Sequence, residues 1–188
     1  MFEIPEDLPL ELSSLAWLLG RWQGWGVLTE EGDSALVQEI RCDIVGTQMR
    51  MVTTLYKGNA DSDVAPELTA AQGLEIITAG DLLREETAYW RVTSPLAVVP
   101  DDDQTPREMA LTSCDTRGLS VLWIGAVMGP RVTLTTDVIA REPGAVDVDR
   151  MTRMYGLVAG ELMWTTDLTV GDAEPEVELT GRLMRVND

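Results

Sequence analysis

Period-two alternation of apolar and polar residues runs through most of the chain from Gly20 onward. It is clearest in residues 36–44, 131–140 and 161–170, where every second position is mainly apolar. Alternation of this kind is typical of a β-strand with one buried face. Together with weaker segments of the same kind, it predicts about ten strands in succession. The weaker segments are residues 21–29, 47–57, 73–80, 85–93, 107–114, 118–128, 145–158 and 177–187.

The connections between these segments favour antiparallel pairing and closure of the sheet. No crossover helix of the kind that parallel strands need separates one segment from the next. A long run of strands without covering helices leaves two open edges unless the sheet closes on itself. We therefore expect an all-β fold, a ten-stranded antiparallel up-and-down β-barrel. Leucines at helical spacing in residues 8–19 predict a short N-terminal helix before it.

Length and composition favour one globular domain. The chain has 188 residues, of which 45% are hydrophobic, and this suits a single domain spanning residues 1–188. Within it, we expect residues 1–14 to form an N-terminal extension and residues 58–72 a long polar loop. No apolar run reaches the roughly 18 residues of a membrane helix. The acidic N-terminus has no signal-peptide pattern. We therefore expect a cytoplasmic protein.

The charge balance limits the partners that this chain can have. Its formal net charge is −18, from 32 acidic and 14 basic residues. Nucleic-acid binding requires clustered Lys and Arg, and Lys57 is the only lysine. The same excess of negative charge disfavours anionic membranes. We expect neither a nucleic-acid nor a membrane partner, and we interpret the charge as a contribution to solubility.

Histidine is absent from the sequence. Its absence excludes Ser-His-Asp and Cys-His catalysis, histidine general bases, and imidazole ligation of a metal or haem. The two cysteines, Cys42 and Cys114, do not form a CxxC motif, so no metal site is predicted. In a cytosolic chain they are interpreted as two reduced, buried thiols.

Residues 119–128, LSVLWIGAVM, are apolar on both faces of their predicted strand. One face of a strand in a solvated barrel is normally polar. The pattern predicts that a helix, a loop or a second subunit covers the outer face, or that one face lines an apolar cavity. An exposed strip of this kind would also suit a homodimer interface.

Residues 20–26, GRWQGWG, combine three glycines and two tryptophans. Glycine within a strand marks a bend or a close backbone approach. Tryptophan is a large apolar anchor whose N–H finds a partner when it is buried. The stretch predicts a sharply bent strand whose rings close one end of a barrel. A Gly-rich turn beside a core aromatic is the alternative, and spacing alone does not separate the two.

This stretch resembles the G-x-W-x-G-x-G motif of the nitrobindins, within the fatty-acid-binding-protein-like group, at Gly20, Trp22, Gly24 and Gly26. Four further segments resemble the family in the same order along the chain. They are LAWLL just before this stretch, GDLLREETAYWRV, the long segment from TTDVIAREPG to DLTVGD, and VELTGRLMRV. The match runs from about Leu15 to Val186. It implies a ten-stranded antiparallel barrel that binds haem b through a histidine on its last strand. It also implies nitric oxide binding and conversion of peroxynitrite to nitrate at the haem iron.

The sequence departs from the family at the iron ligand. Glu178 stands where the haem-ligating histidine is expected, and Arg84 replaces a second family histidine in the middle strand pair. A buried carboxylate beside a porphyrin is costly unless it is paired, and haem iron usually takes His, Cys, Met or Tyr. We therefore expect that iron ligation is lost. The chain would then have no cofactor, no catalytic residue and no enzymatic activity.

Three residues alternate along the last predicted strand and would share its inward face: Glu178, Thr180 and Arg182. Thr180 and Arg182 are therefore candidate polar residues of a cavity, and Arg182 could bind a ligand carboxylate. Pairing of Arg182 with an acidic side chain is the alternative. The leading hypothesis is a barrel without iron ligation that binds a small apolar or amphipathic ligand. The others are a haem-binding peroxynitrite isomerase with a non-histidine ligand, and a structural or partner-binding barrel.

Overall fold

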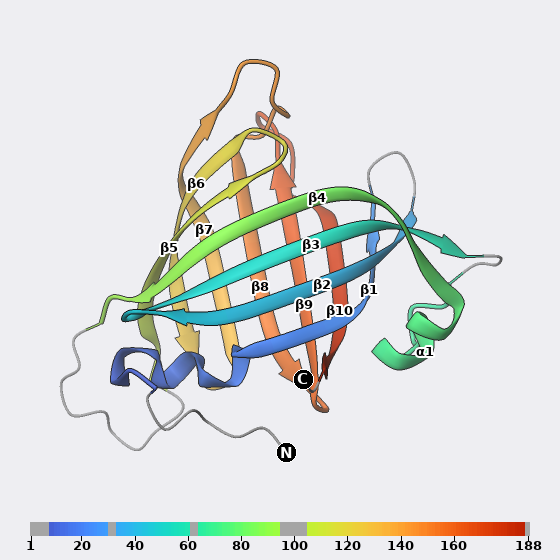
Figure 1. The fold of residues 1–188 in the computed structure, drawn as a ribbon. Helices are drawn as coiled ribbons and strands as arrows, with labels where there is room; N and C mark the ends of the chain where they lie inside the picture. Colours follow the sequence, from blue (N-terminus) through green and yellow to red (C-terminus); the bar gives the residue numbers. More distant parts are fainter. Residues whose placement is uncertain (1–7, 30–32, 61–63, 95–104, 187–188) are drawn as a thin grey trace.

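Ten antiparallel strands close into one barrel in the computed structural model, which describes residues 8–29, 33–60, 64–94 and 105–186. Neighbours in sequence are neighbours in the sheet, and β1 pairs with β10 to close it (Figure 1). The predicted up-and-down barrel is confirmed. The strands are β1 (Gly20–Leu28), β2 (Ser34–Val45), β3 (Gln48–Ala60), β4 (Ile77–Val92), β5 (Arg107–Asp115), β6 (Leu119–Met128), β7 (Arg131–Arg141), β8 (Arg150–Val158), β9 (Glu161–Thr169) and β10 (Glu176–Val186).

A short 3₁₀-helix, η1 (Leu10–Leu18), closes one end of the barrel. Leu12, Leu15 and Leu18 are fully buried and join the main core. The predicted N-terminal helix is therefore present, and it takes in part of the expected extension at residues 1–14. Among the residues that the structure describes, none of the helices has the length and hydropathy needed to cross a membrane.

The segment between β3 and β4 differs from the expected polar loop at residues 58–72. β3 continues to Ala60, and a helix, α1 (Ala70–Ile76), leads directly into β4. Of the two strand candidates, residues 73–76 belong to α1, while the remainder of 73–80 and most of 85–93 lie in the single long strand β4. A capping box starts α1: Gln72 N donates to Thr69 Oγ1 over 3.2 Å, and Thr69 N donates to Gln72 Oε1 over 3.0 Å. This Thr-x-x-Gln signal was visible in the sequence.

Several aromatic side chains lie in the described core of the barrel. Trp90 and Tyr155 meet edge to face with ring centroids 5.3 Å apart, and Tyr155 stacks on Trp164 at 5.5 Å. Trp22 and Trp123 are equally buried. Contacts of this geometry add to the stabilisation from burying apolar area. Five rings, from β1, β4, β6, β8 and β9, therefore join a main core whose other buried members are mainly aliphatic side chains and methionines.

The glycines of β1 allow a close approach between two strand backbones. A Cβ at Gly24 would lie 2.1 Å from the carbonyl oxygen of Arg182, and one at Gly26 would lie 1.9 Å from that of Thr180. Trp22 Nε1 donates to Leu18 O over 2.9 Å and so ties β1 to η1 at the closed end. Trp25 lies on the opposite face of β1, against α1, where its Nε1 donates to Thr69 O over 3.1 Å. One of the two rings therefore helps to close the barrel end.

The two thiols have different environments. Cys42 is buried, and burial raises the pKa of its thiol well above the ordinary value. Cys114 is exposed on β5, so the expectation of two buried thiols is wrong for Cys114. It occupies an outward-facing position of a strand whose inner positions are filled by Met109, Leu111 and Ser113.

The outer face of β6 carries exposed apolar side chains. Ile124 is 45% exposed and Met128 is 41% exposed. The inward positions Leu119, Val121 and Trp123 are buried. The double-sided apolar pattern at residues 119–128 thus reflects one core face and one surface face, and the homodimer stays a prediction.

Candidate functional site

A β-bulge in β10 sets the position of Glu178. The pairing of β10 with β9 shifts between Val177 and Leu179, which leaves Glu178 as the extra residue. Two consecutive side chains are buried as a result, with 3% of Glu178 and 1% of Leu179 exposed. The site lies at the end of the barrel opposite η1, where Thr29 N donates to Glu178 O over 2.9 Å just beyond β1.

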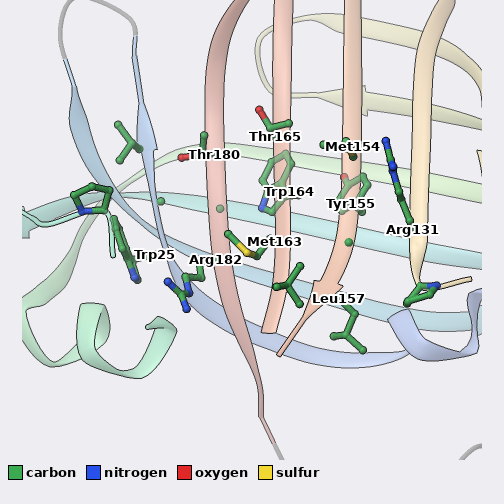
Figure 2. A pocket seen from close by; sticks show the side chains of 17 residues that line it. Trp25, Arg131, Met154, Tyr155, Leu157, Met163, Trp164, Thr165, Thr180 and Arg182 are labelled. Atoms are coloured by element: carbon green, nitrogen blue, oxygen red, sulfur yellow. The ribbon is translucent and has the colours of Figure 1, made fainter. Parts of the chain in front are cut away.

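The same bulge turns Thr180 and Arg182 away from the interior. Beyond it, Leu179, Gly181 and Leu183 take the buried positions. The expectation that Thr180 and Arg182 line the inside of the barrel is therefore wrong, because one inserted residue inverts the alternation of faces. Figure 2 shows both side chains among residues that line a pocket on the outer wall.

Arg182 has acidic and carbonyl partners on that outer wall. Its Nε lies 2.5 Å from Glu161 Oε2, and its Nη1 donates to Glu67 O over 3.2 Å. Glu161 also accepts a hydrogen bond of 2.7 Å from Ala70 N, at the start of α1. Arg182 therefore pairs with an acidic side chain, as the alternative hypothesis has it, but on the outer wall and not inside the barrel, and the pair helps to hold α1 against the barrel.

Glu178 is the acceptor in a cluster of buried ion pairs. Its Oε1 accepts hydrogen bonds from Arg84 Nη2 over 2.8 Å and from Arg117 Nη1 over 2.6 Å. Arg117 pairs in turn with Asp115 over 2.8 Å. Side-chain exposure is 1% for Glu178 and 8% for Arg84. The two positions at which the family resemblance places histidines are thus in direct contact, and the charge of Glu178 is compensated.

The second carboxylate oxygen of Glu178 has a different environment. Oε2 is buried and has no hydrogen-bond partner in the described part of the chain. An ionised carboxylate can accept on both oxygens, and a buried acceptor without a partner is costly. This end of the barrel therefore presents one anionic oxygen that can take a hydrogen-bond donor or a cation.

A second charged pair lies deeper among the aromatic rings. Arg153 Nη1 lies 2.9 Å from Glu86 Oε2, and Arg153 Nε donates to Thr166 Oγ1 over 3.0 Å. The guanidinium also stacks over the Trp123 ring, 4.6 Å from its centroid. Burial opposes ionisation of Arg153, but the Glu86 carboxylate holds the pKa of Arg153 above its ordinary value. This pair is structural in character, because both groups are fully engaged.

Sequence reasoning missed the partnership of Glu86 with Arg153, and the role of Gln38. Gln38 is fully buried, accepts from Trp164 Nε1 over 3.0 Å and donates to Thr180 O over 2.7 Å. The available signal was a polar residue on the apolar face of an alternating strand, which holds for Gln38 and for Arg153. Neither pattern identifies the partner, because the partners come from distant strands.

These observations define a class of protein. A closed antiparallel barrel of this size, with one end sealed by a helix and a polar buried cluster toward the other, is the architecture of small-ligand-binding barrels. The model of the THAP4-like, heme-binding beta-barrel domain family matches residues 11–185. The chain belongs to this family, as the resemblance to the nitrobindins predicts.

Curated relatives share nearly the full length of the chain. A ferric nitrobindin-like protein from Beutenbergia cavernae is 34% identical, with 98% of this chain and 99% of that protein covered. A peroxynitrite isomerase from Leifsonia xyli subsp. xyli is 30% identical, with the same coverage. A crystal structure of a Mycobacterium tuberculosis protein, 21% identical, superposes with a TM-score of 0.71 over 96% of this chain and all of that one. That likeness shows the fold alone.

Two expectations drawn from the missing histidine are corrected by these findings. The expectation of no cofactor is contradicted by the family model, which is that of a heme-binding domain. The expectation of no enzymatic activity is contradicted by relatives, from Leifsonia xyli subsp. xyli and Clavibacter sepedonicus among others, that are named peroxynitrite isomerase. The expectation rested on the cost of a buried carboxylate beside a porphyrin and on the usual haem ligands, and neither argument allows for a carboxylate whose charge is compensated.

Proposed function

We propose that this chain binds ferric haem at the Glu178 end of the barrel and acts on peroxynitrite in that state. Glu178 Oε2 would hold the iron in place of an imidazole nitrogen. One observation carries the proposal: at the ligand position of the family, a buried carboxylate oxygen has no partner in the described part of the chain.

The chemistry of the donor set fits iron in its ferric state. Anionic oxygen is a hard ligand, and catalase uses a tyrosine oxygen on its haem iron. The objection to a carboxylate beside a porphyrin is the cost of burying its charge. Arg84 and Arg117 remove much of that cost, since both donate to Glu178 Oε1. When bound, haem would supply the iron centre for the conversion of peroxynitrite, an anionic oxidant, to nitrate.

The residues around Glu178 orient its carboxylate. Two guanidinium groups from β4 and the β5–β6 turn converge on one oxygen and leave the other available. Asp115 holds Arg117 from the far side through a second ion pair. A carboxylate fixed in this way loses little rotational freedom when it binds a ligand, which favours affinity.

The names of the relatives agree with this proposal in two respects. The Leifsonia xyli protein is named peroxynitrite isomerase. Those from Beutenbergia cavernae and Kineococcus radiotolerans are named ferric nitrobindin-like proteins. An oxygen ligand favours ferric over ferrous iron, because the softer ferrous ion is better matched by nitrogen and sulfur donors.

Stopped-flow decay of peroxynitrite tests the proposed activity. The protein is titrated with ferric hemin, its stoichiometry is read from the Soret band, and decay is followed with loaded protein, unloaded protein and free hemin. We expect one hemin per chain and faster decay with loaded protein than with either control. Absence of saturable hemin binding, or decay no faster than with free hemin, would contradict the proposal.

A further inference from the structure

A pocket of about 690 Å³ lies on the outer wall of the barrel, apart from the Glu178 cluster. It runs across β8, β9 and β10 toward β1, and its lining includes Pro66 and Pro130. In Figure 2, Trp25 and Arg182 lie at one end, Arg131 lies at the other, and Met163 and Met154 lie between them. Pockets of a few hundred to about 1,000 Å³ are the usual size for small ligands.

The strand register explains this arrangement. Five residues stand opposite one another on successive strands, from β7 through β8, β9 and β10 to β1. They form one row across the outer wall: Arg131, Gly156, Met163, Arg182 and Trp25. Neighbouring strands lie about 4.8 Å apart, so the backbones at Arg131 and Arg182 are roughly 14 Å apart. The row therefore places one arginine at each side of an apolar floor, Arg131 on β7 and Arg182 on β10.

The floor of this pocket is apolar and hollow at its centre. Met154 and Met163 are 40% and 39% exposed, unusually open for large apolar side chains. Gly156 lies beside them, and a Cβ there would meet only Pro130 O, at 4.0 Å. Methionine adapts its shape to irregular ligands. A flexible apolar chain would thus cover exposed apolar surface and enter the space above Gly156.

The charge of the pocket differs from that of the molecule. The net charge of the chain is −18, yet the charged side chains that line this pocket are both arginines. Arg182 is balanced by Glu161. Arg131 is exposed, and its side chain makes neither an ion pair nor a hydrogen bond within the described part of the chain. Its guanidinium is therefore available to pair with a carboxylate in two-point contact.

We propose that this pocket binds an amphipathic monocarboxylate, with the carboxylate on Arg131 and the apolar chain over Gly156 and Met163 toward Trp25. The ligand class follows from charge complementarity at one end and apolar surface over the rest. The site is independent of the haem proposal, because Arg131, Gly156 and Met163 lie on the outer wall while Glu178 faces the interior.

Isothermal titration with dodecanoate, with dodecanol as the uncharged comparison, tests this site on the unloaded protein. Arg131→Gln removes the charge, Gly156→Phe fills the hollow, and Arg91→Gln on the outer face of β4 is the matched control. We expect Arg131→Gln to weaken dodecanoate binding by about tenfold or more, the usual effect of losing a charge-assisted hydrogen bond. Gly156→Phe should abolish binding, Arg91→Gln should leave it unchanged, and dodecanol should bind more weakly than dodecanoate.

Three results would overturn the proposal. One is equal binding by the wild type and Arg131→Gln, or no binding by the wild type. Another is competition between hemin and dodecanoate in a protein that binds both, which would move the ligand into the interior. The third is a wild-type dimer in sedimentation that Gly156→Phe makes monomeric, which would assign the pocket to a second copy. Circular dichroism melting of each variant confirms that the fold is retained.

Discussion

Arg84 and Glu178, which are 94 residues apart in the sequence, form a buried ion pair of 2.8 Å that joins β4 to β10. Both occupy positions at which the family resemblance places histidines. Relative to the pattern that the resemblance implies, a charge-compensated pair stands in place of two imidazole rings. The pair explains how a carboxylate is tolerated inside the barrel, and it limits which single substitutions the site can accept.

Glu178→Leu should be strongly destabilising. It leaves the guanidinium groups of Arg84 and Arg117 without their shared acceptor, and breaking a buried pair from one side costs about 3–5 kcal/mol. Adding Arg84→Met to Glu178→Leu should recover part of that loss. Urea unfolding of Glu178→Leu, of Arg84→Met and of the double variant measures the coupling between the two residues. Asp43→Asn, in a partly exposed pair with Arg50, is the control and should cost less than about 1 kcal/mol. Additive losses for Arg84 and Glu178 would mean that the two residues do not interact.

Tyr155 should make stability fall at high pH. Burial raises the pKa of Tyr155 to about 12. An unfolded tyrosine ionises near pH 10. The folded chain therefore retains a proton that the unfolded chain loses, so this contribution is complete below about pH 10 and declines as the pH rises toward 12.

Tyr155→Phe removes that titration. Between pH 9 and 12, the free energy of unfolding should fall for both proteins. The fall should be about 2–3 kcal/mol smaller for Tyr155→Phe than for the wild type. Tyr56 and Tyr89 remain in both proteins and cancel in the comparison. Parallel pH profiles for the two proteins would show that the Tyr155 hydroxyl does not titrate differently on folding.

Gly24→Ala should destabilise the seam between β1 and β10. The added methyl group would lie 2.1 Å from the carbonyl oxygen of Arg182, a backbone atom that can move only if the strands separate. Overpacking of this kind costs about 1–3 kcal/mol. Gly156→Ala is the matched control, because its Cβ has no atom closer than 4.0 Å. Thermal melting compares them, and an equal effect of the two substitutions would contradict the close approach.

Most strands and much of the core were predictable from the sequence, because period-two alternation indicates which side chains face inward, although Val138 and Val170 lie on the predicted buried faces and are 54% and 46% exposed. Gln38 and Arg153 were visible only as polar residues on apolar faces, since their partners come from strands far along the chain. The orientation of Thr180 and Arg182 was not predictable, because alternation cannot reveal the bulge at Glu178. The helix α1 was missed although its capping residues, Thr69 and Gln72, were in view. Its outer position against Trp25 depends on tertiary packing.

The affinity for ferric hemin of the wild type relative to Glu178→Gln tests the central claim most directly. Glutamine keeps the size of the side chain and removes the anionic oxygen, and Arg91→Gln controls for a general loss of charge. We predict saturable one-to-one binding by the wild type and binding at least about tenfold weaker by Glu178→Gln. Glu178→His should restore or raise the affinity. Equal affinities of the wild type and Glu178→Gln, or no saturable binding by the wild type, would contradict the assignment of Glu178 as the iron-binding residue.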